Sequence, residues 1–376
     1  MMQFIDLAAQ QSKIRDRIDA RIASVLDHGS YIMGPEVREF EAALADFCGA
    51  KHCLSCANGT DALQLALMAL GIGPSDHVIV PSFTFAASAE AVCLVGAEPA
   101  FADIDPDSYN MDAASLERVI SEIRAKGGQP KAVMTVDLFG LPADYPTISA
   151  ICDREGLALI CDSAQGFGGL IDGQMTGTFG TITTTSFFPA KPLGCYGDGG
   201  ALFTNDPALA GLIDSLRVHG KGTEKYDNVR IGMNSRLDTL QAAILLEKLA
   251  IYAEETALRQ DVAKRYDAAL HNRFVTPRVP EGYQSVWAQY TLRAVSADER
   301  QAAMAALKAE GIPSVVYYPR PLHTQSIYAS FLCDPQGLAA SETCAETVFS
   351  LPMHPYLSPE DQERVISVLN GMEARA

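Results

Sequence analysis

Residues 186–194 read Ser186-Phe187-Phe188-Pro189-Ala190-Lys191-Pro192-Leu193-Gly194, and an apolar run upstream ends in Asp162-Ser163-Ala164-Gln165. Lys191 stands among uncharged and glycine-rich neighbours, and a desolvated amine has a lowered pKa and is a good nucleophile. Asp162 is expected at the end of a buried strand, where a carboxylate needs a cationic partner. A pyridoxal phosphate (PLP) enzyme requires a lysine that forms a Schiff base and a carboxylate that keeps the ring nitrogen protonated. The two runs therefore predict a PLP site.

The run Ala57-Asn58-Gly59-Thr60-Asp61-Ala62-Leu63 precedes a helical pattern and predicts a phosphate-binding turn. Gly59 permits close backbone approach, Thr60 supplies a hydroxyl, and a helix N-terminus supplies free N–H groups and a positive dipole. Ser186 precedes Lys191 closely enough to contact the same phosphate. An ordinary N-cap turn is the alternative for residues 57–63, because Asn, Gly and Thr are preferred there.

Two further side chains are expected to contact the ring of the cofactor. Gln165 lies three residues after Asp162 and can reach the phenolic oxygen of PLP, while Ala164 leaves room for the ring. Phe85, in the run Pro81-Ser82-Phe83-Thr84-Phe85, can stack on the opposite face of the ring. Simple core packing is the alternative for Phe85, since a phenylalanine after a strand is often buried.

Short apolar runs alternate with helical patterns, which predicts an α/β fold with a mostly parallel sheet covered on both faces. Ligands bind beyond the carboxyl ends of such strands, where Asp162 and Ser186 are expected. The predicted strands are 78–80, 100–102, 132–136, 157–160 and 201–204, and the predicted helices are 13–28, 37–48, 61–70, 86–94, 114–125 and 145–155. A long amphipathic stretch, from Leu237 to about Tyr266, leads to an α+β part with strands 289–293 and 314–318 and helices 298–309 and 359–372. We expect a large PLP-binding domain over residues 1–245 and a smaller C-terminal domain over residues 246–376.

The composition narrows the class of protein. The chain has 376 residues, enough for two domains, and its 29 Lys and Arg against 46 Asp and Glu give a net charge of −17. Nucleic acids and anionic membranes require clustered positive charge, so neither is expected as a partner. No apolar run reaches the roughly 18–20 residues of a membrane span, and residues 1–6 lack the pattern of a signal peptide. We expect a soluble cytoplasmic protein.

The nine cysteines are scattered, and Cys53 and Cys56 are the one pair with a suggestive spacing. A zinc site of this kind needs a second pair, which the sequence does not offer. We therefore expect reduced, mostly buried thiols and no metal, with a redox or metal role as the alternative.

Together these motifs resemble the DegT/StrS family of PLP-dependent sugar aminotransferases, which have the aspartate-aminotransferase-like fold called fold type I. The resemblance extends over nearly the whole chain, because the motifs occur in the order found in that family. In addition to the four runs quoted above, the motifs are residues 31–36 (Tyr-Ile-Met-Gly-Pro-Glu), Gly199-Gly200, and residues 232–238 (Gly-Met-Asn-Ser-Arg-Leu-Asp).

The resemblance implies roles for individual residues. Lys191 would form the Schiff base and shuttle protons, Asp162 would pair with the pyridine nitrogen and Gln165 would contact the ring oxygen. Phe85 would stack on the ring, and the phosphate would be bound by Gly59, Thr60 and Ser186. Asn234 would reach the phosphate across the interface of a homodimer, so that each active site is shared between two subunits. Arg236 would face the substrate.

Within the family, the chain is most similar to enzymes that aminate UDP-2-acetamido-2-deoxy-3-oxo-glucuronate for bacterial surface polysaccharide, with L-glutamate as the usual donor. This subgroup can show His-Tyr before a proline where the present chain has Tyr317-Tyr318-Pro319, so a substrate contact made by that histidine would be altered. Arg320 and Arg236 are candidates for binding a carboxylate or diphosphate, and His323 is a weaker substrate candidate. The alternatives are a 4-keto-hexose aminotransferase of the perosamine-synthase type and a non-catalytic regulatory sensor.

Overall fold

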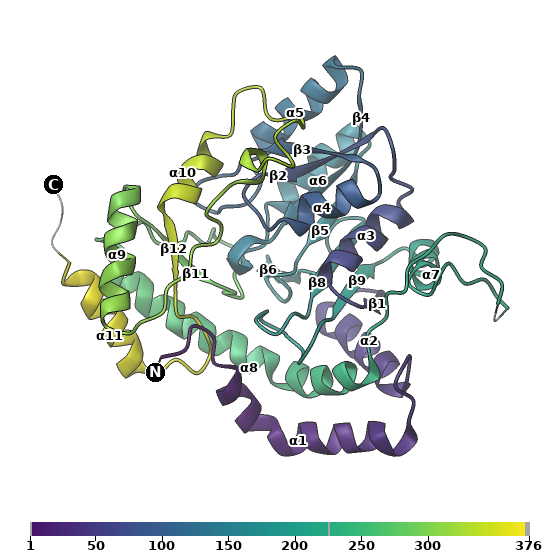
Figure 1. The fold of residues 1–376 in the computed structure, drawn as a ribbon, viewed down its shortest axis with the longest axis horizontal. Helices are drawn as coiled ribbons and strands as arrows, with labels where there is room; N and C mark the ends of the chain where they lie inside the picture. The colour runs from purple at the N-terminus through teal and green to yellow at the C-terminus, as the bar shows by residue number, and fades with distance from the viewer. Residues whose placement is uncertain (1, 225, 373–376) are drawn as a thin grey trace.

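Seven strands form a central sheet in the computed structural model, which describes residues 2–224 and 226–372 (Figure 1). The strands are β1 (His52–Cys56), β2 (Asp76–Pro81), β3 (Glu98–Ala102), β4 (Gln129–Val136), β5 (Ala158–Asp162), β8 (Ile182–Ser186) and β9 (Gly200–Thr204). They lie side by side in the order β1-β9-β8-β5-β4-β2-β3. β9 is antiparallel to both of its neighbours, while β3, β2, β4, β5 and β8 pair in parallel. The expected mostly parallel sheet is confirmed.

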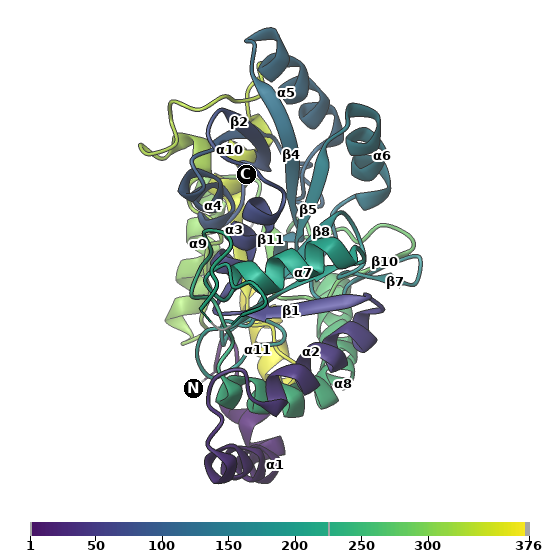
Figure 2. The ribbon, with the colours of Figure 1, turned by 90° about the vertical axis from the view of Figure 1, so that its right-hand side faces the viewer.

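Helices cover both faces of this sheet, as Figure 2 shows. One face packs against α3 (Gly59–Ala69), α4 (Ala87–Leu94) and α7 (Pro207–Leu216). The other face packs against α5 (Ala113–Ala125) and α6 (Tyr145–Glu155) at one end, and against α2 (Pro35–Cys48) and α8 (Thr239–Leu270) at the other. Strands with apolar side chains on both faces require this double cover, because each face must be removed from water.

α8 extends from the central sheet to a smaller part of the molecule (Figure 1). There its second half packs with α9 (Ala297–Ala309), α11 (Pro359–Asn370) and a two-stranded sheet of β11 (Tyr290–Arg293) and β12 (Val348–Leu351). The remaining elements are α1 (Leu7–His28), α10 (Ala339–Thr347), η1 (Leu138–Gly140), η2 (Leu322–Thr324), and the short strands β6 (Leu170–Ile171), β7 (Gln174–Met175) and β10 (Tyr283–Gln284). The expected division between residues 245 and 246 falls inside α8 and stays a prediction.

The helices and strands predicted by periodicity are found within about four residues of their expected bounds, except that α1 begins six residues earlier than expected and that one predicted strand is missing. Residues 314–318 were expected to form a strand, but this expectation is wrong, because the segment contributes a single bridge between Val315 and Ser350. Pro313 and Pro319 flank it and lack the N–H groups that a strand ladder uses. The sequence pattern also missed β1, α7 and β12.

Two observations concern the membrane-spanning helices and the reactive or metal-binding cysteines that the sequence analysis did not expect. Across residues 2–224 and 226–372, none of the helices is long and apolar enough to span a membrane. All nine cysteines are free, and burial raises the pKa of the Cys53 and Cys56 thiols. Buried thiols with raised pKa values are poor nucleophiles and poor metal ligands, because both roles require the thiolate.

We expect Ile160→Ala to lower the free energy of unfolding by about 2–5 kcal/mol, because it removes a side chain from the packed core and leaves a cavity. Ile160 lies in β5 and is 0% exposed. Leu26→Ala in α1 is the control, since Leu26 is 56% exposed and its replacement should cost about 0.5 kcal/mol or less. Denaturant unfolding followed by circular dichroism measures both variants. Equal losses would contradict the placement of Ile160 in the core.

Candidate active site

The parallel strands bring the predicted motifs to one edge of the sheet. Asp162 ends β5 and Ser186 ends β8, and Gly59 begins the helix that follows β1. β9 begins at the same edge, because its first residue, Gly200, pairs with both Ser186 and Cys56. Four segments that are distant in the sequence therefore meet where the topology places ligands in sheets of this kind.

Gly59 and Ser186 form a close contact between the turn before α3 and the end of β8. A Cβ on Gly59 would lie 2.7 Å from Ser186 Cβ, which no real side chain tolerates, so this approach requires glycine. Asn58 caps α3, and its Oδ1 accepts the N–H of Asp61 at 2.8 Å. The N–H groups of Gly59 and Thr60 belong to the first turn and have no partner inside the helix. With the Ser186 hydroxyl beside them, they form a cradle suited to a phosphate.

Asp162 and Lys191 form the charged pair of the site. Asp162 is 7% exposed, and one of its carboxylate oxygens, Oδ1, accepts the N–H of Ala164 at 3.0 Å. Burial raises the pKa of the Asp162 carboxyl, while the Ala164 hydrogen bond and the Lys191 charge oppose the rise. Burial also lowers the pKa of the Lys191 amine against the attraction of Asp162. Desolvation thus outweighs the mutual attraction in both groups, and a further cation beside Asp162 would restore its ordinary pKa.

Hydrogen bonds fix the orientation of the Gln165 amide. Its Oε1 accepts the N–H of Phe139 at 2.9 Å, and its Nε2 donates to the Tyr318 hydroxyl at 3.2 Å. Phe139 has a positive φ of 59°, an uncommon conformation that turns its backbone at this contact. Because Oε1 is occupied by a backbone donor, Nε2 is the end of the amide that can donate to a ring oxygen.

Asp137 supports the segment of Asp162 and was missed in the sequence. Its N–H donates to the carbonyl of Asp162 at 2.9 Å, and its fully buried carboxylate accepts the Ser163 hydroxyl at 2.5 Å and the Tyr145 hydroxyl at 2.6 Å. Burial raises its pKa to about 7. Asp137 directly follows the apolar strand β4, the same signal that singled out Asp162, so the sequence could have indicated it.

Phe85 lies on the rim of a hollow next to the site instead of in the core. Its side chain is 56% exposed, and its ring centroid lies 6.1 Å from that of Tyr318. The hollow has a volume of about 430 Å³ and is also lined by Arg320 and Ile327. The core-packing alternative for Phe85 is thereby disfavoured, because an exposed ring beside a hollow is available to a ligand. Arg320 is exposed and donates to the carbonyl of Thr324 at 2.8 Å.

Tyr317 and His323 have neighbours within the protein. The Tyr317 ring packs against that of Phe4, with centroids 6.3 Å apart. The Ser82 hydroxyl and His323 Nδ1 lie 2.6 Å apart, and His323 Nε2 lies 3.1 Å from the Glu342 carboxylate. Both ring nitrogens of His323 therefore have protein partners. This arrangement favours loop packing over a substrate contact for His323.

Asn234 and Arg236 lie on the segment between α7 and α8, where Arg236 donates to Asn234 Oδ1. Asn234 is exposed. The residue between them, Ser235, is fully buried, and its hydroxyl accepts the N–H of Ala57 at 3.1 Å. The segment is thereby attached to the run that leads into the Gly59 turn. The expected contact of Asn234 with a partner subunit stays a prediction.

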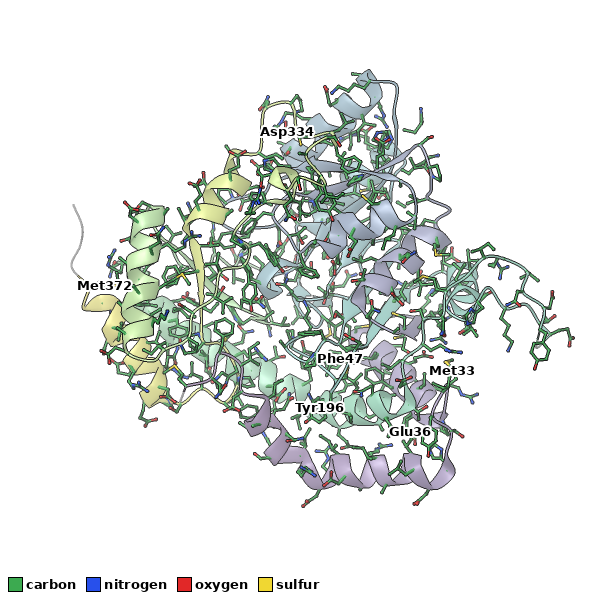
Figure 3. All side chains as sticks on the ribbon, viewed as in Figure 1. Met33, Glu36, Phe47, Tyr196, Asp334 and Met372 are labelled. Atoms are coloured by element: carbon green, nitrogen blue, oxygen red, sulfur yellow. The ribbon has the colours of Figure 1, made fainter. Side chains whose placement is uncertain are left out.

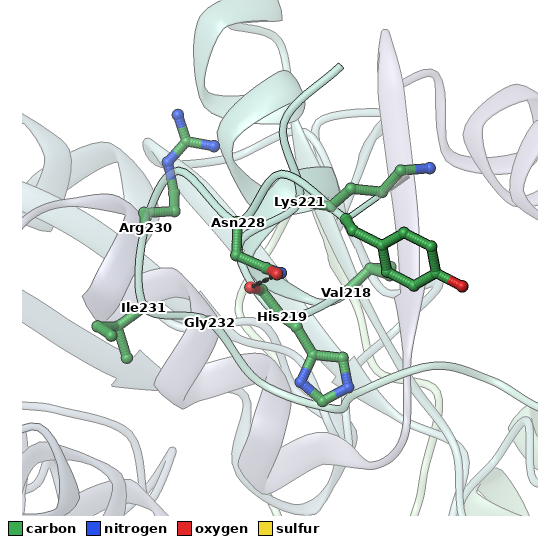
Figure 4. A pocket seen from close by; sticks show the side chains of 8 residues that line it. Val218, His219, Lys221, Asn228, Arg230, Ile231 and Gly232 are labelled. Carbon is green, nitrogen blue, oxygen red and sulfur yellow. Dashed lines mark hydrogen bonds between the residues drawn. The ribbon is translucent and has the colours of Figure 1, made fainter. Parts of the chain in front are cut away.

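Residues 218–224 and 226–232, which precede Asn234 in the same segment, extend away from the body of the molecule (Figure 1). They enclose a hollow of about 510 Å³, drawn in Figure 4. The Asn228 amide donates to the carbonyl of His219 at 2.9 Å across this hollow. Lys221 and Arg230 line it and give it positive charge, which the sequence analysis did not single out.

The residues present fit PLP. Asp162 is a buried carboxylate that lacks a full cationic partner, and a protonated ring nitrogen would supply one. The glycine at position 59 lets unpaired N–H groups approach Ser186 at the place where a phosphate would need them. Lys191 is an amine with a lowered pKa that interacts with Asp162. Asp162 thus suits the pyridine nitrogen of the cofactor, the turn at Gly59 suits its phosphate, and Lys191 suits its aldehyde.

Comparison with known proteins gives the same class. The model of the DegT/DnrJ/EryC1/StrS aminotransferase family matches residues 12–370. UDP-2-acetamido-2-deoxy-3-oxo-D-glucuronate aminotransferase of Pseudomonas aeruginosa is 51% identical, over 99% of this chain and 100% of that protein. The crystal structure of a DegT/DnrJ/EryC1/StrS aminotransferase from Brucella abortus is 54% identical and superposes with a TM-score of 0.98 over 100% of both chains. NtdA of Bacillus subtilis, solved with bound pyridoxamine phosphate (PMP), is 30% identical over 98% of this chain and 82% of that chain, with a TM-score of 0.87.

These similarities confirm the family, the enzyme class and the fold type that the motifs predicted. Because the family model spans nearly the whole chain, the protein belongs to the DegT/DnrJ/EryC1/StrS aminotransferase family.

Proposed function

We propose that the protein transfers the amino group of L-glutamate to carbon 3 of UDP-2-acetamido-2-deoxy-3-oxo-glucuronate, with PLP as cofactor, in the synthesis of bacterial surface polysaccharide. The observation that carries this proposal is the buried Asp162 and the partly buried Lys191, which interact electrostatically beside the Gly59–Ser186 cradle. The 51% identical relative, which is named for this reaction, supports the choice of sugar. The proposed location is the cytoplasm.

PLP, when bound, supplies an aldehyde that captures amines and a ring that withdraws electrons from the attached carbon. Lys191 would hold the cofactor through Nζ, the amine with the lowered pKa. The lowered pKa of Lys191 increases the fraction of Nζ that carries no proton, so Nζ can then take a proton from the α-carbon of glutamate. Asp162 would hold the proton on the ring nitrogen, and Gln165 Nε2 would donate to the ring oxygen.

The substrate carries negative charge at its diphosphate and at its uronate carboxylate, and both groups favour arginine partners. Arg320 lines the hollow next to Phe85, and Arg236 lies beside Asn234. We assign one arginine to each anionic group without ordering them. Tyr317 and Tyr318 complete this side of the proposed site, and Tyr318 also contacts Gln165. We assign His323 no substrate contact, because both of its ring nitrogens have partners within the protein.

A half-reaction experiment tests the proposed function. Purified protein is treated with L-glutamate, freed of the donor, and mixed in parallel with the UDP-linked 3-keto uronate and with a nucleotide-linked 4-keto hexose. We expect 2-oxoglutarate in the first stage and an amino sugar from the 3-keto uronate in the second, both identified by mass spectrometry. Amination of the 4-keto hexose alone would move the protein to the perosamine-synthase type. If no 2-oxoglutarate forms, the proposed donor is contradicted. If the protein also reacts with no other amino donor, the non-catalytic regulatory sensor is the alternative that remains.

Lys191→Ala should lower the rate of transamination by at least about 10²–10⁴-fold, because it removes the group that moves the proton. Lys264→Ala is the matched control, since the Lys264 side chain is 77% exposed on α8. Steady-state release of 2-oxoglutarate measures both. Full activity in the Lys191 variant would reject the assignment of the catalytic lysine.

Asp162→Asn should leave the fold intact but lower the rate by about 10²–10³-fold, because a neutral amide cannot stabilise the protonated ring nitrogen during the reaction. Thermal unfolding of the variant checks that the fold is retained. Near-normal turnover in a folded Asp162→Asn protein would rule out the pairing of this carboxylate with the ring nitrogen.

Mixing two inactive variants tests the shared site. Asn234→Asp places a carboxylate where we expect the partner's phosphate, so this variant should lose most of its affinity for PLP through charge repulsion. In a mixed dimer with Lys191→Ala chains, one of the two sites would contain both native residues. The two variants are mixed in the unfolded state and refolded together. We expect activity to reappear in the refolded mixture. No recovery, in a mixture shown to contain mixed dimers, would mean that Asn234 does not serve the neighbouring site.

A further inference from the structure

The loop that carries Lys191 is closed by its own backbone. Phe187, at its start, donates its N–H to the carbonyl of Gly199 at 2.7 Å and accepts the N–H of Cys195 at 2.8 Å. The Lys191 N–H donates to the carbonyl of Phe188 at 2.8 Å. Phe187 and Cys195 are both fully buried. These bonds hold Cys195 and the backbone of Lys191, whereas Gly194 and Tyr196, on either side of Cys195, are bound by side chains from outside the loop.

α8 supplies two side chains that bind this loop. Lys248 Nζ donates to the carbonyl of Gly194 at 2.6 Å and lies 4.2 Å from the centroid of the Tyr196 ring. Gln241 accepts the N–H of Tyr196 at 2.9 Å and donates to its carbonyl at 3.4 Å. Lys248 and Gln241 are seven residues apart, about two helical turns, and so lie on the same face of α8. Figure 3 labels Tyr196 beside α8, on the side that faces α1.

Lys248 is an unusual group for this place. It is 1% exposed, and burial lowers the pKa of its amine to about 8, with Glu255 and Cys195 opposing the shift. Burying a lysine is costly unless its charge is compensated. An apolar residue would fill the same space at lower cost, so the contacts that Lys248 makes with the loop are the feature that distinguishes it. Those contacts begin three residues after Lys191.

We propose that Lys248, together with Gln241, is a positioning residue that fixes the backbone of residues 194–196 and thereby places the Lys191 amine for capture of PLP. The proposal rests on the proposed function of Lys191. Lys248 does not touch the reacting atoms in this account. Its role is to hold the loop in position. Such positioning matters because a displacement of about 1 Å in a reacting group can lower the rate by about 10²-fold.

The test uses the full chain without cofactor. PLP is added to the protein, samples are reduced with borohydride at increasing times, and the fraction labelled at Lys191 is measured by peptide mass spectrometry. We expect Lys248→Met to slow this capture by about 10²-fold and to change the visible circular dichroism of the bound cofactor. Lys248→Arg keeps a charge and a donor and should recover part of the rate. Gln241→Leu should slow the capture less, because the Lys248 contact remains.

Two controls separate positioning from general stability. Lys264→Met removes an exposed lysine of the same helix, and Leu307→Ala creates a cavity in the core of the smaller part, far along the chain from the loop. Leu307→Ala should lower the melting temperature without slowing capture at Lys191. If Lys248→Met captures PLP at the wild-type rate, or no more slowly than Leu307→Ala, the positioning role is rejected. If Lys248→Met does not fold, the rate of PLP capture by Gln241→Leu is the test. Capture at the wild-type rate overturns the proposal, and slower capture supports it.

Failure of the proposed function gives a different result. Wild-type protein that never takes the label at Lys191 would contradict the PLP site itself. Wild-type protein that takes the label there while the Lys248 and Gln241 variants match it would contradict the positioning role alone. Because the capture assay contains neither donor nor sugar, its result does not depend on the identity of the substrate.

Discussion

The site depends on the desolvation of two ionisable groups, Asp162 and Lys191, at one edge of the sheet. Asp162 and Lys191 attract each other, yet desolvation raises the pKa of the carboxyl and lowers that of the amine, so burial is the larger effect. The desolvation of these two groups costs free energy. A new cation beside Asp162 or a new bond at the Lys191 amine would offset part of that cost. Both changes are what a protonated pyridine and an aldehyde would provide.

The rest of the structure holds these two groups in place. Asp162 is fixed through its backbone by Asp137 and through its carboxylate by the N–H of Ala164. Gln165 is oriented by the Phe139 N–H. The loop of Lys191 is closed by hydrogen bonds at Phe187 and is bound from outside by Lys248 of α8. α8 also packs in the core of the smaller part, so the helix connects that core with the loop of the reactive lysine.

Much of the fold and of the site could be predicted from the sequence, and the reasons are physical. The apolar runs of β4 and β5 are buried on both faces, so composition alone marks them as strands of a covered parallel sheet. Asp162 and Ser186 followed from the rule that ligands bind at the carboxyl ends of such strands. Gly59 could be placed because close approach of two backbones excludes a Cβ, and the contact with Ser186 has this character.

Other features could not be read from the chain in isolation. Residues 314–318 have the composition of a strand, but among them only Val315 pairs, in a single bridge to Ser350. Lys248 lies in a helix of mixed polarity, and nothing in its sequence neighbourhood indicates that it points at the Gly194 carbonyl 54 positions earlier. Contacts of this kind depend on how α8 crosses the sheet, which local patterns do not encode. The expected contact of Asn234 involves a second chain, and patterns within one chain do not encode such an interface.

The central claim is that Lys191 is the lysine that holds PLP. Lys248 is its natural competitor, since it is a buried lysine in the same region and the pKa of its amine is lowered, as is that of Lys191. The most direct measurement is borohydride reduction of the wild-type protein with bound PLP, followed by peptide mapping. We predict the reduced cofactor on Lys191, with Lys248 unmodified. A label on Lys248, or labels spread over exposed lysines with none on Lys191, would contradict the account.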